Sequence, residues 1–147
     1  MKYVSKNWST TEWDCYQRSS NEFAYDNEEG RLVTTNENTA KLFRILDMLR
    51  DWNPNWIVNW TNAGYKSGMR TPEVNAEVGG VPTSNHIYGC AADIHESNTD
   101  ASAEALAETI KAAAKYNGLD DEIELGIYHG QGWCHIATPG YLNIYDA

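Results

Sequence analysis

The chain contains four imidazole side chains that could bind a metal or carry a proton: His86, His95, His129 and His135. His86 stands seven residues before Asp93, and Gly89 between them can supply a turn that brings the chain back. Catalytic zinc takes three protein ligands from histidines and carboxylates, acidifies a water at its open position and polarises the scissile carbonyl. His86, Asp93 and His135 could form such a site, but a histidine and an aspartate at this spacing are common by chance.

Three segments, taken together, resemble one known family. Residues 67–75 read SGMRTPEVN, residues 84–93 read SNHIYGCAAD and residues 133–136 read WCHI. In this order they resemble the S-G-x-R-T-P-x-x-N segment, the S-x-H-x-x-G-x-A-x-D signature and the W-V-H-V strand of the zinc D-Ala-D-Ala carboxypeptidase family. Residues 79–84 and 7–15 resemble further parts of the family's sequences, so the resemblance covers most of the chain.

The resemblance implies both a fold and an activity. The family includes vancomycin-resistance dipeptidases, phage endolysins and tail-associated murein peptidases, and it shares its fold with the hedgehog signalling domain. We therefore expect a zinc metallopeptidase that hydrolyses the stem peptides of peptidoglycan, either as a D-Ala-D-Ala carboxypeptidase or as a murein endopeptidase of the endolysin type. Bonds of the D-Ala-D-Ala, L-Ala-D-Glu and interpeptide kinds all remain open as substrates.

The matched motifs also imply roles for single residues. Three residues are implied as zinc ligands: His86, Asp93 and His135. Arg70 matches the arginine that contacts the substrate carbonyl or the developing oxyanion, and Ser84 matches a serine that helps to hold the substrate. The plainer alternatives are a surface ion pair of Arg70 with Glu73 or Glu77, and a bond from the Ser84 hydroxyl to its own backbone.

The general base is the point at which this sequence departs from the family. The carboxypeptidases carry an acidic residue three positions before the last histidine ligand, where this chain has Gly132. A hairpin with a three-residue loop would pair His129 with Trp133 and turn His129 to the face of His135. We therefore predict His129 as general base or oxyanion donor, with a hairpin histidine of no role as the alternative. The same parity turns Glu124 to the opposite face.

Other reactive side chains stand next to the expected ligands. His95 follows Asp93 by two residues and could support the metal, or it could simply end a strand. Cys90 and Cys134 should point to the other face of their strands as small buried hydrophobes, with thiolate ligation as the minor possibility. Three cysteines do not make a disulfide framework.

Helices are predicted where apolar residues recur at helical spacing. The first covers residues 38–52, with Asn38 or Thr39 as its N-cap. The second runs from a cap at Asp100 to about Tyr116, where an Asn-Gly pair stops it.

Strands are predicted at residues 56–61, at residues 90–95 and in a hairpin within residues 123–136. Residues 62–90 should be mostly loop, because they hold many glycines, prolines, asparagines and serines. This order lacks a strict βαβ alternation, which predicts an α+β fold. We expect a small, largely antiparallel sheet flanked by helices, in the manner of the hedgehog and DD-peptidase folds, as one domain over residues 1–147.

Charge and composition exclude several function classes. The net charge is −10 and no cluster of lysines and arginines interrupts it, so neither nucleic acid nor an anionic membrane is an expected partner. No apolar run approaches about 20 residues, so no membrane span is expected. The first residues lack the apolar stretch of a signal peptide, which favours synthesis in a cytoplasm and action on the cell wall as a phage or prophage product. The sequence indicates no oligomeric state.

Two functions of other classes stay open beside the peptidase. Gly132, in the place of the family's acid, would suit a zinc-containing module that binds the cell wall but hydrolyses it weakly. The chain could also be a structural component of a phage tail.

Overall fold

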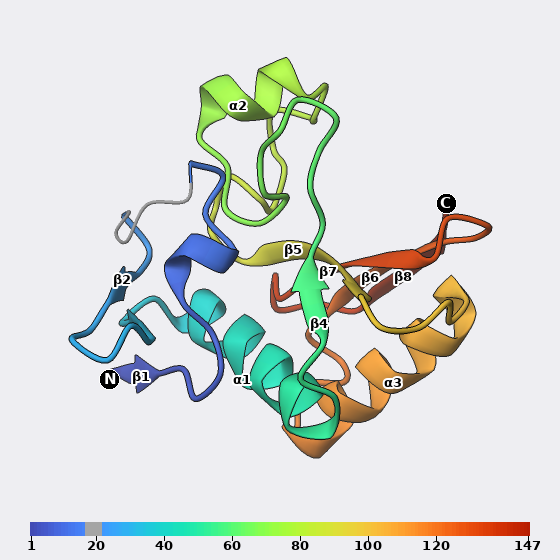
Figure 1. The fold of residues 1–147 in the computed structure, drawn as a ribbon, viewed down its shortest axis with the longest axis horizontal. Helices are drawn as coiled ribbons and strands as arrows, with labels where there is room; N and C mark the ends of the chain where they lie inside the picture. Colours follow the sequence, from blue (N-terminus) through green and yellow to red (C-terminus); the bar gives the residue numbers. More distant parts are fainter. Residues whose placement is uncertain (17–21) are drawn as a thin grey trace.

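The computed structural model describes residues 1–16 and 22–147, and a five-stranded sheet lies at its centre (Figure 1). Its strands, in spatial order, are β4 (Trp56–Val58), β5 (Ala91–Glu96), β7 (Trp133–Ala137), β6 (Glu124–Tyr128) and β8 (Asn143–Asp146). Neighbouring strands run antiparallel except β6 and β8, which are parallel. The predicted α+β class with a largely antiparallel sheet is confirmed.

The two faces of this sheet have opposite characters. Helices α1 (Glu37–Trp52) and α3 (Ala103–Tyr116) pack together, and α3 contacts β6 and β7. The residues of this sheet that belong to the buried core are Trp56, Val58, Ala92, Ile94, Leu125, Ile127, Cys134 and Ile136. Because side chains alternate along a strand, the residues between them, including Asp93, Glu124 and His135, point to the other face.

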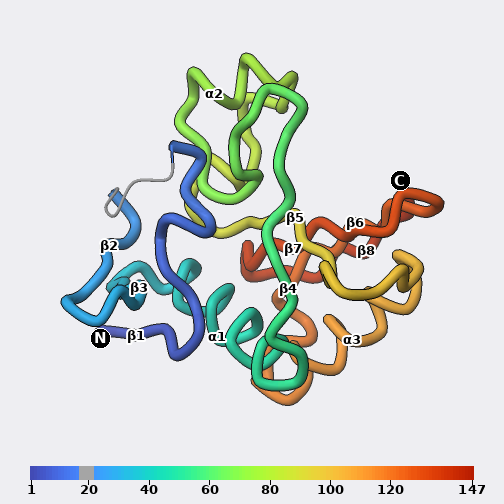
Figure 2. Tube along the Cα trace, in the orientation of Figure 1, coloured from blue at the N-terminus to red at the C-terminus, as the bar shows by residue number. Residues whose placement is uncertain are grey.

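The segment between β4 and β5 lies on the far side of the sheet from α1 and α3 (Figure 2). It contains α2 (Pro72–Glu77), which the sequence analysis treated as loop. Thr71 caps this helix by accepting from the backbone N–H of Val74, and proline occupies its first position. The segment contacts β5 at Ser67, whose carbonyl accepts from the Asp93 backbone N–H over 2.9 Å.

The N-terminal segment forms a second, small sheet that the sequence analysis did not predict. Its strands are β1 (Tyr3–Val4), β3 (Leu32–Thr34) and β2 (Tyr25–Asp26), with the short 3-10 helix Thr10–Glu12 between β1 and β2. Ser9 is the N-cap of that turn, and its backbone N–H donates to the Glu12 carboxylate over 3.0 Å. Strands of two or three residues carry too little periodic pattern to be found from sequence.

Both long helices are confirmed, but their caps are not the expected residues. The side chain of Asn36, rather than Asn38 or Thr39, caps α1 by accepting from the backbone N–H of Thr39 over 3.0 Å. Ser102, rather than Asp100, caps α3 by accepting from Ala105 over 3.1 Å. Several polar residues in a row can each act as a cap, so sequence leaves the boundary uncertain by a few residues.

The hairpin register differs from the prediction by one residue. Tyr128, not His129, pairs with Trp133, and Gly126 pairs with His135, so four residues form the loop. Gly130 and Gly132 both have positive φ, 75° and 73°, and turn the chain within this loop. The stacked rings of Tyr128 and Trp133, 3.7 Å apart, also stabilise this register.

None of the helices within residues 1–16 and 22–147 combines the length and the apolar composition needed to span a bilayer.

A buried carboxylate joins the N-terminal segment to α1. Asp47, 6% exposed, accepts from the Ser5 hydroxyl over 2.8 Å and from the backbone N–H groups of Lys6 and Asn7 over 3.0 and 2.9 Å. The Tyr3 hydroxyl also donates to it. Without this carboxylate the four donors would have no acceptor at this position, and unpaired buried donors are costly.

Asp47→Ala should lower the free energy of unfolding by about 2–4 kcal/mol, measured by urea denaturation, because it leaves buried donors unpaired. Asp51→Ala is the matched control on the same helix. Asp51 pairs with Lys6 on the surface, with its side chain 41% exposed, so its loss should cost less than about 1 kcal/mol. Equal effects of the two substitutions would contradict the role given to Asp47.

Candidate metal centre and cleft

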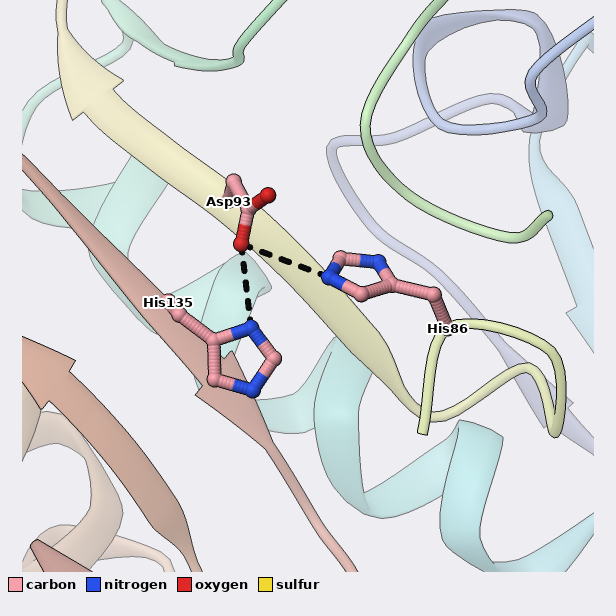
Figure 3. Close-up of side chains that lie close together, drawn as sticks. All are labelled: His86, Asp93 and His135. Carbon is pink, nitrogen blue, oxygen red and sulfur yellow. Dashed lines mark hydrogen bonds and ion pairs between the residues drawn. The ribbon is translucent and has the colours of Figure 1, made fainter. Parts of the chain in front are cut away.

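His86, Asp93 and His135 converge on one point, although they come from three segments (Figure 3). Asp93 on β5 lies directly opposite His135 on β7, and His86 lies in the loop before β5. Asp93 Oδ1 is 3.4 Å from His86 Nε2 and 3.0 Å from His135 Nδ1. One potential ligand atom from each residue lies within 4.8 Å of the others, and all three residues are buried. We name this cluster the candidate metal centre.

The loop that carries His86 is held from two sides. Gly89 turns the chain with φ of 68°, as expected from sequence, and a Cβ at this position would lie 2.3 Å from the Phe23 ring. The hydroxyl of Thr39, at the start of α1, donates to the Gly89 carbonyl over 2.8 Å. From the other side, the Arg70 backbone N–H donates to the His86 carbonyl over 3.0 Å.

A backbone carbonyl fixes the protonation of the His86 ring. His86 Nδ1 lies 2.7 Å from the Gly68 carbonyl oxygen, which can only accept a hydrogen bond. Nδ1 therefore carries a proton, which leaves Nε2, the nitrogen nearest to Asp93, as the ring atom that a metal could bind. Metal-binding histidines in proteins are oriented in this way by a second hydrogen bond.

The electrostatics of the centre favour a cation. Burial alone would raise the pKa of Asp93, but His86 and His135 hold it well below the usual range. Burial likewise lowers the pKa of His135, but hydrogen bonds to Asp93 and Glu124 raise it to about 9. Two imidazole nitrogens and a carboxylate oxygen, buried next to a cleft, are the donor set of a catalytic zinc site. The residues present therefore fit zinc.

Ser67 and Arg70 bind the second oxygen of Asp93. The Ser67 hydroxyl donates to Asp93 Oδ2 over 2.5 Å, and Arg70 Nη2 donates to the Ser67 oxygen over 2.7 Å. Arg70 Nη2 is also 3.6 Å from Asp93 Oδ2. Among the described residues, Arg70 therefore forms its ion pair with Asp93, and not with Glu73 or Glu77 as in the alternative considered from sequence. Ser67 was not predicted as a site residue, although it is the first residue of the segment at 67–75 that resembles the family.

The structure does not bring His129 to the metal centre. His129 Nε2 lies 2.6 Å from Asp146 Oδ1, its Nδ1 contacts Glu104, and its side chain is 41% exposed. The predicted role of His129 depended on a hairpin register that is wrong by one residue. A slip of one residue moves every side chain of a strand to the other face, so His129 does not share a face with His135.

Glu124 occupies the position that was expected for His129. Its Oε1 lies 2.8 Å from His135 Nε2, and the side-chain amides of Asn85 and Asn143 donate to its carboxylate over 3.4 and 3.3 Å. The hydrogen bond from His135 lowers the pKa of Glu124, against the opposing effect of burial. The prediction that Glu124 faces away from His135 is therefore wrong. Its cross-strand partner, Ala137, is small and leaves the carboxylate room to turn towards His135.

The remaining candidates lie at the edge of the centre or outside it. The Ser84 hydroxyl accepts from the His86 backbone N–H over 3.2 Å, which is the local bonding considered as the alternative for it. His95 Nδ1 lies 2.6 Å from Asn59 Oδ1, outside the ligand cluster. Burial raises the pKa of Cys90 to about 11 and that of Cys134 to about 12, so both stay neutral thiols.

The metal centre lies where two cavities meet. The first, about 500 Å³, is named here the tyrosine half, and its lining includes Ser84, His86, Glu124, Tyr128, His135, Tyr141 and Tyr145. The second, about 480 Å³, is the tryptophan half, and its lining includes Asn59, Trp60, Asn62, Glu77, Gln131 and Trp133. Arg70 and Asp93 line both halves, so the two form one cleft across the centre.

The family model of peptidase M15 matches residues 17–137, which is most of the chain and includes all three residues of the metal centre. Searches of curated proteins and of solved structures gave no significant match.

His86→Ala should abolish stoichiometric zinc binding, because it removes one of three ligands while the strands that carry the other two remain. Metal content after dialysis, measured by atomic absorption, should fall from one zinc per chain to a trace. His95→Ala is the control, since His95 is close in sequence but outside the cluster, and it should keep full zinc. Full zinc content in His86→Ala would rule out this ligand set.

Proposed function

Because the chain belongs to the peptidase M15 family, a family of metallopeptidases, we propose that it is a zinc peptidase that hydrolyses peptide bonds of peptidoglycan. The observation that carries the proposal is the buried cluster of His86, Asp93 and His135 at the junction of the two cleft halves. The acidic chain, with a net charge of −10, does not suit nucleic acid as a partner. Action on the cell wall, as a phage or prophage product, is part of this proposal.

The three residues of the centre would hold the metal through His86 Nε2, an Asp93 oxygen and His135 Nδ1. When bound, zinc supplies a Lewis acid for the scissile carbonyl and lowers the pKa of a water molecule. Gly68, Ser67 and Glu124 each hydrogen-bond one of the three ligands and hold it in this orientation.

Glu124 is the proposed proton carrier, in place of His129. Its carboxylate lines the cleft and lies within hydrogen-bond distance of a ligand, so it can accept the proton of the attacking water. It can then pass that proton to the nitrogen of the leaving amine as the C–N bond breaks. The products are one new carboxylate and one new amine, which balances the addition of one water.

Arg70 is the proposed donor to the substrate oxygen that gains charge. Its guanidinium lies at the junction of the two halves, and the buried Nε–H has no partner among the described residues. A guanidinium held by Ser67 and Asn75 is a fixed donor, as stabilisation of an oxyanion requires. The Ser84 hydroxyl, which acts as an acceptor towards His86, keeps its own O–H as a donor to the substrate.

The position of Glu124 also favours a peptidase over a module that binds zinc without hydrolysing peptides. Glu124 would orient His135 in either kind of protein, but only a peptidase also needs a carboxylate in the cleft that can carry a proton. The position of Glu124, with an arginine across the centre, supports hydrolysis despite the glycine at position 132.

Glu124→Gln should keep one zinc per chain and lower kcat for peptidoglycan about 10²–10⁴-fold, because the amide still accepts from His135 but cannot carry a proton. The rate is measured as new amino groups released from purified peptidoglycan, with zinc-loaded protein and with protein treated with EDTA. His129→Ala is the control and should keep the wild-type rate within about twofold. Wild-type activity in Glu124→Gln would restrict Glu124 to orienting His135, and failure of the zinc-loaded wild type to act would refute the proposed function.

Arg70→Lys should lower kcat about 10²-fold or more with little change in melting temperature, because an ammonium cannot reproduce the fixed guanidinium donors. Steady-state rates and thermal melts of the same preparations test this. An unchanged rate with a lowered melting temperature would make Arg70 a structural partner of Asp93 only.

A further inference from the structure

The cleft continues on both sides of the metal centre, and the one lysine or arginine among the described residues that line it, Arg70, is already paired. We propose that the protein is an endopeptidase: it cuts an internal bond of a longer strand, and the tryptophan half holds the part of the strand that continues beyond that bond. This inference rests on the proposed function and specifies its substrate.

The two halves are of nearly equal size, about 500 and 480 Å³, and Asp93 lines both, so the cleft extends to either side of the metal centre. Tyr128 lines one half and Trp133 the other, and their rings stack 3.7 Å apart. This stacked pair lies on the same sheet face as His135, so it joins the floors of the two halves beside the centre. A strand bound across the centre could therefore extend in both directions.

Neither half is suited to a terminal carboxylate. An enzyme that removes a single terminal residue must neutralise the charge of that terminus, because a buried carboxylate without a partner is costly. Among the described residues that line the two halves, Arg70 is the only lysine or arginine. It already binds Ser67, Asn75 and Asp93. The tryptophan half also contains Glu77, which would repel a carboxylate.

The tryptophan half presents a fixed aromatic surface instead. Trp60 is 53% exposed, yet it is held by a β-bridge to Lys66, whose Nζ lies 4.6 Å from the centre of the indole ring. The Thr61 backbone N–H donates to the Tyr65 carbonyl over 2.7 Å and closes this short loop. An exposed indole held in place loses little entropy on binding and is a good contact for apolar groups and sugar rings.

Neutral polar groups complete this half. The side chains of Asn62 and Gln131 line it beside Trp60 and Trp133 and can both donate and accept hydrogen bonds. Aromatic faces with amide side chains match an uncharged, amide-rich strand. They do not match a charged chain end.

The products formed from purified peptidoglycan sacculi distinguish the two modes. Zinc-loaded protein should release fragments in which both sides of the cut keep two or more residues, as identified by mass spectrometry. Free D-alanine as the only product would overturn the endopeptidase and leave the proposed zinc peptidase intact. If zinc-loaded protein cuts no bond in sacculi, the proposed function fails, and this inference fails with it.

Trp60→Ala tests the role of the tryptophan half, with Trp52→Ala as the matched control. Trp52 is also exposed, at 46%, but it packs against Tyr116 at the end of α1, away from the cleft. Trp60→Ala should lower kcat/KM on sacculi about tenfold with unchanged zinc content, and Trp52→Ala should change it less than about twofold. Equal rates in the two variants would overturn the role of Trp60.

A binding measurement separates recognition from turnover. Metal-free protein is titrated with purified peptide-cross-linked muropeptide dimers by calorimetry. Trp60→Ala should weaken their binding about tenfold relative to Trp52→Ala. Equal affinities would show that the tryptophan half does not hold the continuing strand.

Discussion

Asp93 and His135 face each other across β5 and β7, and their contact of 3.0 Å fixes the geometry on which the site depends. Both side chains project from paired strands, so the sheet itself sets their separation, without help from a flexible loop. His86 is the one residue of the candidate metal centre that a loop supplies, and its Nε2 lies 3.4 Å from Asp93 Oδ1. Ser67 reaches the other Asp93 oxygen because its own backbone continues the pairing along β5.

The fold class and the cluster of candidate metal-binding residues could be predicted from the sequence, but the register of the hairpin could not. The ligand motifs are contiguous, so their residues could be named from the sequence alone, and their convergence agrees with that prediction. The loop of the hairpin contains two glycines, and either a three- or a four-residue loop satisfies its composition. The length of this loop decides whether His129 or Glu124 lies beside His135. Hydrophobic periodicity could not decide it, because Gly126, opposite His135, carries no side chain.

The sheet separates stability from chemistry by its two faces. One face is apolar and packs on α1 and α3, where burial provides stability. The other face has a connected set of polar groups that bond one another, with Asp93 and Glu124 each satisfied by several donors. Substitutions on the polar face can therefore alter chemistry without loosening the core. The N-terminal segment, which hydrogen-bonds to Asp47 of α1, also contributes to the stability of the fold rather than to the site.

The bonds of the metal centre join residues far apart in the chain. Asp93 and His135 are separated by 42 residues, and Ser67 and Asp93 by 26. Contacts of such long range form late in folding, because the chain must first lose the entropy of closing long loops. A nascent or unfolded chain therefore presents no assembled donor set, and high-affinity metal uptake has to follow the pairing of β5 with β7. Binding of a metal at this centre would therefore be coupled to folding, and the bound metal would stabilise the folded chain.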